Sequence, residues 1–390
     1  MKRIAMVVLS SYPIDVRVRR EAEALRDAGT KIDVLCITQR GELTKENVNG
    51  INVFRLNLKR HRAGKFRYLL EYALFFTWSF LKLAHLELRN RYDIIHVHNM
   101  PDFLVFTALI PKLFGAKIVL DLHDPMPELF SSMIKVDENH YIVKILKFFE
   151  KICIKFANLV LTPNIAFKKL FVSRGCPESK IQIVMNSPDE KVFKYHNNSI
   201  KESRYSSKFL LMYHGAVVER HGLDIAVKAV AELREKIPNI YMVIYGRGNF
   251  LAKVANLIEE LNLRDHFEIR GFAVVDEIAA FIPQIDIGVI PNRINSFTQL
   301  NFPVRIFEYL INKKPVIVPE TGGIQDYFDP DSIYYFKPGD STNLAETIFS
   351  IYSNNGESKK ILKKSYNVYK NYTWELQKQQ LIERELGLIR

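Results

Sequence analysis

The chain has 390 residues, of which 48% are hydrophobic and 25% charged, and its formal net charge is +12. This composition excludes a disordered or fibrous protein, and the length exceeds what one hydrophobic core usually organises, so two domains are expected. The positive charge favours a polyanionic partner such as nucleic acid, an anionic membrane surface or phosphorylated small molecules.

The first half of the chain alternates short apolar runs with segments of helical period, a pattern typical of βαβ units and a parallel sheet. Its predicted strands are residues 4–9, 32–38, 93–98, 117–122, 159–162 and 182–185. The first apolar run is too short for a signal peptide and is assigned to the first strand. A helix is expected over residues 15–28, with Asp15 as its N-cap and Gly29 in a left-handed turn at its end.

A polar segment without sustained periodicity, residues 191–207, separates this series of strands from a second one. The second series is predicted at residues 209–213, 240–245, 267–270, 286–290, 315–319 and 333–336. We therefore expect an α/β protein with two Rossmann-like, doubly wound parallel-sheet domains that face each other across a cleft. The expected domains span residues 1–190 and 208–370, and residues 371–390 form a C-terminal helix.

Residues 66–88 approach the length of a membrane span but carry Glu71, Lys82, His85 and Glu87, which exclude a transmembrane helix. A basic segment overlaps the start of this stretch, and it consists of Lys59, Arg60, Arg62, Lys65 and Arg67. A basic rim beside apolar and aromatic residues suits the surface of an anionic bilayer. A buried helix of the first domain with a solvated charged end is the alternative.

Ligands of an open parallel sheet bind beyond the carboxyl ends of its strands, so the polar residues that follow each strand are candidates. Asp15 and Arg17 follow the first strand, and His123 and Asp124 follow the fourth. Asp121 precedes His123 at the end of that strand. Carboxylates on both sides of a histidine favour a functional role for His123 over a turn-capping role.

His96 and His98 flank Val97 at the end of another strand, which places both histidines on the same face of the sheet. As a metal-binding pair they lack further ligands nearby, so packing or hydrogen bonding is the preferred role.

Glycines follow two strands of the second half, with Gly215 after the first of them and Gly246 after the next. A glycine at a strand end lets the backbone approach a ligand closely, and Arg220 can pair with a phosphate near a helix start. Neither region matches GxGxxG or a P-loop, which disfavours dinucleotide-dependent hydride transfer and P-loop ATP hydrolysis. A plain turn at each glycine remains the alternative.

Pro303 opens a predicted helix in which Arg305 and Glu308 lie one turn apart on one face. The strand that follows ends in Gly322 and Gly323, whose backbone amides can cradle a phosphate or a sugar hydroxyl. An arginine for phosphate and a carboxylate for ribose together indicate a site for a nucleoside diphosphate. A simple salt bridge between Arg305 and Glu308 is the alternative.

Taken in order, these motifs resemble the GT-B enzymes of glycosyltransferase family 4, the group 1 glycosyltransferases, in their F-E-Y form. The resemblance covers essentially the whole chain. It is carried by Y-P-I-D-V-R-V-R-R-E-A from Tyr12, D-I-I-H-V-H from Asp93, D-L-H-D from Asp121, H-G through R-H-G from His214, and R-I-F-E-Y with K-P-V from Arg305.

The resemblance implies a retaining transfer of a sugar from a nucleoside-diphosphate sugar, without a required metal or other cofactor. It further implies an acceptor that is a glycan or a lipid-linked molecule of cell-envelope polysaccharide or lipopolysaccharide synthesis. By this likeness Glu308 binds the ribose, His123 orients the sugar, and Arg220 and Arg305 stabilise the departing diphosphate with the amides of the Gly-Gly loop. The remaining implied site residues are Gly215 and Gly246 on the donor side and Asp15, Arg17, His98 and Asp124 on the acceptor side.

The chain departs from the family pattern at Leu300, which replaces the first glutamate of the E-x7-E element, and at Arg305, which replaces a lysine. This leaves the donor sugar open. Two other functions stay possible on this fold, a sugar-nucleotide epimerase and a noncatalytic nucleotide-sugar-binding subunit. Nucleic-acid binding is disfavoured because no aromatic-basic recognition motif is present.

The last helix of the family commonly returns to the first domain, and residues 372–388 resemble that helix, with Trp374 as a packing anchor. The three cysteines show no CxxC spacing, which argues against disulfides and a zinc site. We expect a cytoplasmic protein, peripheral at the inner face of the cell membrane.

Overall fold

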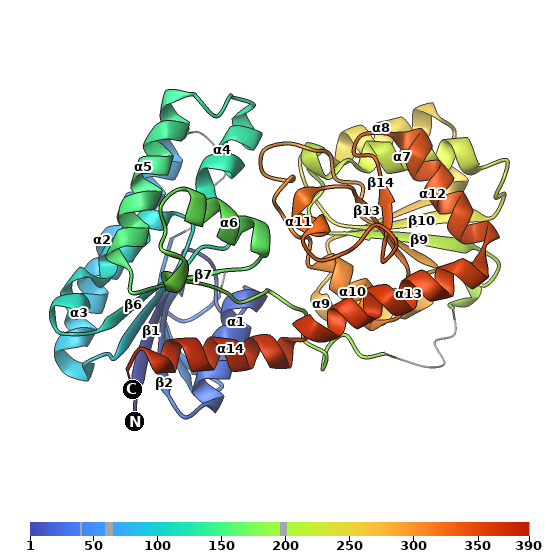
Figure 1. Ribbon diagram of the computed structural model, residues 1–390. Coiled ribbons are helices and arrows are strands. Elements are labelled where there is room, and N and C mark those ends of the chain that lie inside the picture. The colour runs from blue at the N-terminus through green and yellow to red at the C-terminus, as the bar shows by residue number, and fades with distance from the viewer. Residues whose placement is uncertain (40, 59–64, 196–200, 390) are drawn as a thin grey trace. The chain divides into compact units, whose positions relative to one another are not determined.

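The computed structural model shows two compact units, each built on its own sheet (Figure 1). Unit 1 comprises Met1–Asn186 and Glu375–Arg390, and unit 2 comprises Ser187–Trp374. The structure describes residues 1–39, 41–58, 65–195 and 201–389. Residues 196–200 of the expected linker therefore lie outside the described residues, and the C-terminal segment belongs to the unit formed by the first half of the chain.

Within the described residues, the sheet of unit 1 has eight strands in the order β3-β4-β2-β1-β5-β6-β7-β8. These are β1 (Arg3–Val7), β2 (Lys31–Ile37), β3 (Lys45–Val48), β4 (Ile51–Leu56), β5 (Ile94–His98), β6 (Lys117–Asp121), β7 (Leu159–Thr162) and β8 (Ile181–Ile183). All six strands predicted in this half are present, and they pair in parallel. Their apolar runs are buried because a parallel sheet is covered on both faces.

The sequence pattern missed an antiparallel hairpin formed by β3 and β4 at the edge of this sheet. Asn49 and Gly50 connect the two strands with φ angles of 51° and 84°, as a two-residue hairpin turn requires. β3 reads KENV and alternates exposed with half-buried positions, so it lacks an apolar run that periodicity could detect. The Asn-Gly pair was the available signal.

The helices of unit 1 are α1 (Val16–Asp27), α2 (Lys65–Asn90), α3 (Leu109–Leu113), α4 (Met126–Ile134), α5 (Tyr141–Phe156), α6 (Ile165–Ser173) and α14 (Trp374–Gly387), with a 3-10 helix at Asp102–Ala108. The predicted ends of α1 are confirmed. The side chain of Asp15 accepts a hydrogen bond from the Arg17 amide at 3.3 Å, and Gly29 has φ of 86°.

Unit 2 carries a six-stranded parallel sheet in the order β11-β10-β9-β12-β13-β14 within the described residues. Its strands are β9 (Phe209–His214), β10 (Ile240–Tyr245), β11 (Phe267–Gly271), β12 (Ile287–Val289), β13 (Val316–Pro319) and β14 (Tyr334–Phe336). Its helices are α7 (Leu223–Leu233), α8 (Leu251–Glu260), α9 (Val275–Phe281), α10 (Arg305–Ile311), α11 (Gly322–Gln325), α12 (Ser341–Ser353) and α13 (Asn355–Tyr369). Counted from β9, the order is 3-2-1-4-5-6, so unit 2 has a Rossmann-type sheet with all six predicted strands.

The long helix α2 packs against the 3-10 helix Asp102–Ala108 through ring contacts of Tyr72 and Phe76 with Phe103. Phe75 and Leu83 are also fully buried. Among the described helices, none combines the length and the apolar character needed to cross a bilayer. Residues 59–64, which include most of the basic segment expected at a membrane, lie outside the described residues.

Candidate functional site

In unit 1 the strand order reverses between β1 and β5, so the loops after β1, β5 and β6 meet at one edge of the sheet. β5 ends at His98 and β6 at Asp121, while Asp15 caps the helix that follows β1. The carboxyl edge of unit 1 therefore collects the polar residues that the sequence placed after these strands.

His98 and His123 share the carboxylate of Asp121. Nδ1 of His98 lies 3.2 Å from Oδ2 of Asp121, and Nε2 of His123 lies 3.1 Å from the same oxygen. The two imidazole rings stack with centroids 5.4 Å apart. Burial lowers the pKa of His98 to about 4 and that of His123 to about 3. Both rings are then neutral near pH 7, where they can exchange hydrogen bonds without carrying charge.

Asn99 orders the loop that carries His123. Its Oδ1 accepts a hydrogen bond from the His123 amide at 2.9 Å, and its Nδ2 donates to the main-chain oxygen of Asp124 at 2.8 Å. Asp15 pairs with Arg17, whose Nη2 lies 3.2 Å from Oδ2 of Asp15. Burial alone would raise the pKa of Asp15, but Arg17 lowers it to about 2. Asn99 was not among the predicted residues.

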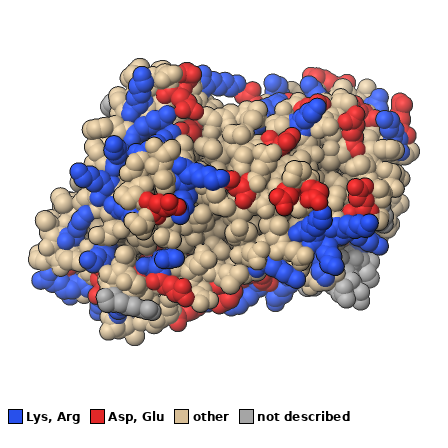
Figure 2. All heavy atoms as spheres, viewed as in Figure 1, with Lys and Arg blue, Asp and Glu red and all other residues tan. Residues whose placement is uncertain are grey.

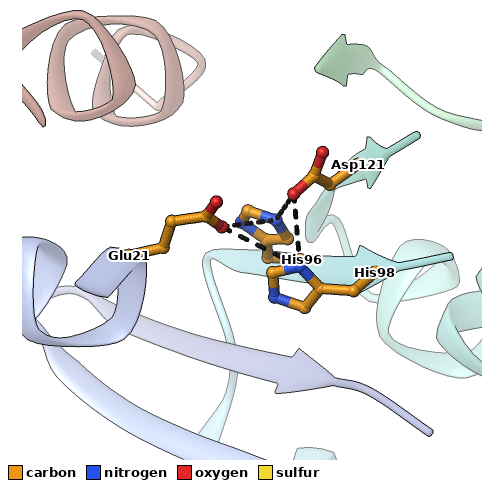
Figure 3. Close-up of side chains that lie close together, drawn as sticks. All are labelled: Glu21, His96, His98 and Asp121. Carbon is orange, nitrogen blue, oxygen red and sulfur yellow. Dashed lines mark hydrogen bonds and ion pairs between the residues drawn. The ribbon is translucent and has the colours of Figure 1, made fainter. Parts of the chain in front are cut away.

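The expectation that His96 and His98 lack further ligands is wrong. Glu21 of α1 and Asp121 of β6 point toward the two histidines, and all four side chains are buried (Figure 3). Glu385 of α14 adds a fifth group, because its Oε1 lies 2.7 Å from Nδ1 of His96. The hydrogen-bonding role expected for His96 is present, but with partners that no local pattern indicated.

In unit 2 the strand order reverses between β9 and β12, and β9 ends there at His214. Arg305 and Glu308 both reach this strand end from α10. The guanidinium of Arg305 donates to the main-chain oxygen of His214 and lies 4.7 Å from the ring centroid of Tyr213. Oε2 of Glu308 lies 3.1 Å from Nε2 of His214. The two α10 side chains thus converge on His214, at the position where open α/β sheets bind ligands.

Packing beneath α10 explains how Glu308 is positioned. The neighbouring Tyr309 is fully buried, and its hydroxyl donates to the main-chain oxygen of Met212 at 3.1 Å. A Cβ at Gly288 of β12 would lie 2.4 Å from the Tyr309 ring, so only glycine fits beside it. Burial, with a smaller contribution from Arg305, lowers the pKa of His214 well below its usual range. The ring that contacts Glu308 is therefore neutral.

Gly215 and Gly246 lie side by side at the sheet edge. The Gly215 amide donates to the Tyr245 oxygen at 2.9 Å, and the Gly246 amide donates to the Gly271 oxygen at 2.6 Å. A Cβ at Gly246 would lie 2.0 Å from the Gly215 oxygen. Glycine at 246 therefore permits close packing of these two strand ends, and both amides already take part in the backbone network.

The expectation that both glycine amides of the α11 loop face a ligand needs correction. The Gly323 amide donates to the Gln299 oxygen at 2.9 Å, so it is already paired. A Cβ at Gly323 would lie 2.4 Å from the main-chain oxygen of Leu300. Glycine is required at 323 because the backbone of residues 299–301 passes against it. Gly322 opens α11.

Arg220 lies in a 3-10 turn, Glu219–His221, just before α7, and its guanidinium carbon is 6.0 Å from the ring centroid of Phe297. His221 contacts the Ala216 oxygen through Nδ1 at 2.7 Å. Gly222 has φ of 63°, and a Cβ there would lie 2.0 Å from the main-chain oxygen of Pro291. The loops after β9 and β12 therefore touch at the point where the strand order reverses, and Arg220 lies in one of them.

Two family models match the chain. The model described as glycosyl transferases group 1 matches residues 195–368, and the model described as glycosyl transferase 4-like domain matches residues 14–187. The chain is 22% identical to an uncharacterized glycosyltransferase of Methanocaldococcus jannaschii, with 96% of this chain and 95% of that protein covered. It is also 22% identical to the amylovoran biosynthesis glycosyltransferase AmsK of Erwinia amylovora, with 50% and 47% covered.

Solved structures share the fold. Sucrose-phosphate synthase from Thermosynechococcus elongatus superposes with a TM-score of 0.79 at 17% identity, covering 100% of both chains. HepE of Anabaena, in complex with UDP and glucose, superposes with a TM-score of 0.75 at 16% identity, covering 99% of this chain and 100% of that one.

Proposed function

The chain belongs to the group 1 glycosyltransferases of GT-B fold, and from that premise we propose which transfer it carries out and how. It moves a sugar from a nucleoside-diphosphate sugar to a glycan or lipid-linked acceptor of a cell-envelope polysaccharide. Unit 2 binds the donor nucleotide, and unit 1 supplies the acceptor side. The anomeric configuration is retained.

The observation that carries this proposal is the convergence of Arg305 and Glu308 on His214 at the strand-order reversal of unit 2. In the proposed complex Glu308 accepts hydrogen bonds from the ribose hydroxyls. Arg305 and Arg220 face the diphosphate, whose negative charge grows as the sugar leaves. An arginine suits this role because its guanidinium can bind two phosphate oxygens at once. Gly215, Gly246 and the Gly322 loop keep the backbone close enough for these contacts.

On the acceptor side, His123 orients the transferred sugar as a neutral hydrogen-bonding group, which agrees with its pKa of about 3. His98, Asp15, Arg17 and the Asp124 loop border the acceptor. We propose that the leaving phosphate removes the acceptor proton, so that the reaction needs no metal ion. The main requirement on the protein is then to hold donor and acceptor in reacting positions.

The names of two similar proteins support a nucleotide-sugar donor and a role in polysaccharide synthesis. AmsK is named for amylovoran biosynthesis, and HepE is described in complex with UDP and glucose. A uridine nucleotide donor and an exopolysaccharide acceptor are the first pair to test.

The test is a thermal-shift and turnover screen of UDP-, GDP-, ADP- and CMP-sugars with the wild type, Glu308→Ala and Glu235→Ala. Glu235 is an exposed carboxylate beyond the end of α7 and serves as the matched control. One donor should stabilise the wild type and Glu235→Ala but not Glu308→Ala, and its nucleoside diphosphate should be released. No stabilisation by any donor would overturn the proposal, and binding without turnover on any acceptor would favour a noncatalytic subunit.

A membrane-facing surface is the second part of the proposal, and α5 supports it better than the segment 59–67. Five of its side chains are exposed and apolar or aromatic: Tyr141, Ile145, Phe148, Phe149 and Ile152. Lys144, Lys147, Lys151 and Lys155 lie on the same helix, and blue side chains border tan surface where α4 and α5 lie (Figure 2). Apolar side chains flanked by lysines bind an anionic bilayer at its surface.

Flotation with liposomes tests this surface. Wild-type protein should float with vesicles that contain anionic lipid and stay below with neutral ones. Phe148→Ser with Phe149→Ser should lose flotation, whereas Phe349→Ser, a change of one exposed phenylalanine in unit 2, should keep it. Equal flotation of the α5 variant and the wild type would refute the assignment.

A further inference from the structure

Four side chains from three elements of unit 1 point their ligand atoms toward one another (Figure 3). They are Glu21 of α1, His96 and His98 of β5, and Asp121 of β6. His96 and His98 are fully buried, and Asp121 and Glu21 are 4% and 8% exposed. The proposed sugar transfer uses His98 but leaves the other three without a role.

Four of the distances between these atoms are close to those between the ligands of one metal ion. A metal ion with ligand bonds of 2.0–2.2 Å holds tetrahedral ligand atoms about 3.3 to 3.6 Å apart. Oδ2 of Asp121 lies 3.2 Å from Nδ1 of His98 and 3.7 Å from Nε2 of His96. Oε2 of Glu21 lies 3.8 Å and 3.6 Å from the same two nitrogens. These four distances lie around that range, and all four ligand atoms lie within 4.8 Å of one another.

Two of these atoms are buried without a hydrogen-bond partner. Nε2 of His96 and Oε2 of Glu21 both lack one, although each faces the centre of the cluster. Buried polar atoms in folded proteins are nearly always paired, so an unpaired nitrogen and oxygen that face each other indicate a bound species between them. A cation that accepts electron pairs satisfies both atoms at once.

The surroundings match those of a metal site. Metal-binding histidines usually donate their other ring N–H to a carboxylate, and Nδ1 of His96 lies 2.7 Å from Oε1 of Glu385. Carboxylate ligands are themselves hydrogen-bonded, and His123 contacts Asp121 at 3.1 Å. Glu21 and Asp121 supply two negative charges to a divalent ion, and Glu385 places a third carboxylate beside His96.

We propose that this cluster binds one Zn²⁺ ion through His96 Nε2, His98 Nδ1, and one oxygen each of Glu21 and Asp121. Two imidazoles and two carboxylates are ligands that suit zinc, which usually binds four such groups in a tetrahedron. With four protein ligands the coordination shell is closed, so the ion is structural and takes no part in sugar transfer. It joins α1, β5 and β6, and the contact of Glu385 with His96 connects α14 to the same ion.

The experiment uses the full-length chain, purified without a histidine tag, stripped with a chelator and titrated with ZnSO₄ by calorimetry. One equivalent should bind and raise the melting temperature. Glu21→Gln should weaken binding strongly, and Glu385→Gln should weaken it by about 10- to 100-fold, as removal of an outer-shell partner does. Glu23→Gln, two residues along the same helix, should bind as the wild type does.

Absence of saturable zinc binding near one equivalent would overturn the proposal. The histidines and carboxylates would then be joined by hydrogen bonds alone. Equal affinity of the wild type, Glu21→Gln and Glu385→Gln would also overturn it, because zinc would then bind elsewhere. If circular dichroism shows that the variants do not fold, Co²⁺ replaces Zn²⁺ in the wild type. Intense visible bands of a four-coordinate ion support the site, and the weak spectrum of a six-coordinate ion refutes it. None of these measurements depends on sugar transfer.

Discussion

Arg174 connects three helices of unit 1, and its replacement offers a sharp test of the packing. It caps the end of α6, and its Nη1 lies 3.1 Å from Oε2 of Glu128 on α4 and 3.2 Å from Oε1 of Glu150 on α5. The two carboxyl groups are 2% and 1% exposed. Arg174→Met keeps much of the side-chain volume and removes the cation that both carboxyl groups contact.

The expected loss follows from burial. Removing one partner of a buried ion pair destabilises a protein by roughly 3 to 5 kcal/mol, because the other charge is left uncompensated. Unit 1 has about 200 residues, and a domain of that size loses about 2 to 4 °C in melting temperature per kcal/mol. Arg174→Met should therefore lower the melting temperature of unit 1 by roughly 6 to 20 °C.

The loss should grow above pH 8. Burial raises the pKa of Glu150 to about 8, and Arg174 acts in the opposite direction. Folded wild type thus retains a proton that the unfolded chain releases, so its stability falls as pH rises from the unfolded pKa near 4.5 to 8 and then levels off. Without Arg174 the pKa of Glu150 is higher, and the variant should lose about 1.4 kcal/mol per further pH unit.

Urea unfolding followed by Trp78 fluorescence measures the effect, in a Trp374→Phe background because the chain has two tryptophans. The control adds Glu128→Gln and Glu150→Gln to Arg174→Met. Removing Arg174 together with both carboxyl groups should recover much of the stability, since replacement of a whole buried ion cluster is often nearly neutral. A loss below 1 kcal/mol at both pH 7 and pH 9, or a triple variant less stable than the single one, would refute this reasoning.

Three further outcomes are expected. Gly288→Ala should destabilise unit 2 by about 1 to 3 kcal/mol in urea unfolding, because its Cβ would meet the Tyr309 ring at 2.4 Å, whereas Gly356→Ala in α13 should be neutral or stabilising. Burial lowers the pKa of His221 to about 3, so its NMR signals should stay those of a neutral ring from pH 8 to 5, and its contribution to stability should fall as pH drops below about 6.5. Asp15→Ala should cost about 1 kcal/mol through loss of the α1 cap, and Asp15→Asn should restore most of it in thermal melts.

The sequence predicted the strands of both units well because parallel strands are buried on both faces. Such strands read as continuous apolar runs, and β10, with the sequence IYMVIY, begins and ends as predicted. β3 carries a single apolar residue at a sheet edge, so periodicity could not reveal it. Strands that are buried on both faces were therefore predicted accurately, whereas the exposed edge strand was missed.

The positions of polar residues were predictable where they are local to a strand end or a helix start. The sequence placed His123, Arg305 and Glu308 at such positions, and the structure shows a polar partner beside each of them. Gly323 was assigned to ligand binding, but its amide and its missing Cβ serve the backbone of residues 299–301. A glycine pair after a strand indicates that other atoms pass close to its backbone. The sequence alone does not show whether those atoms belong to a ligand or to another segment of the chain.

Glu385 shows the limit of local reasoning more clearly, because 289 residues separate it from His96. On α14 it is one of several glutamates, and no spacing marks it as the buried one. Glu385 contacts His96 of β5 only because the C-terminal helix α14 packs in unit 1. The helix that completes the fold of unit 1 therefore also contributes to the electrostatic environment of the β5 histidines, so a change far along the chain can alter the polar residues at the carboxyl edge of unit 1.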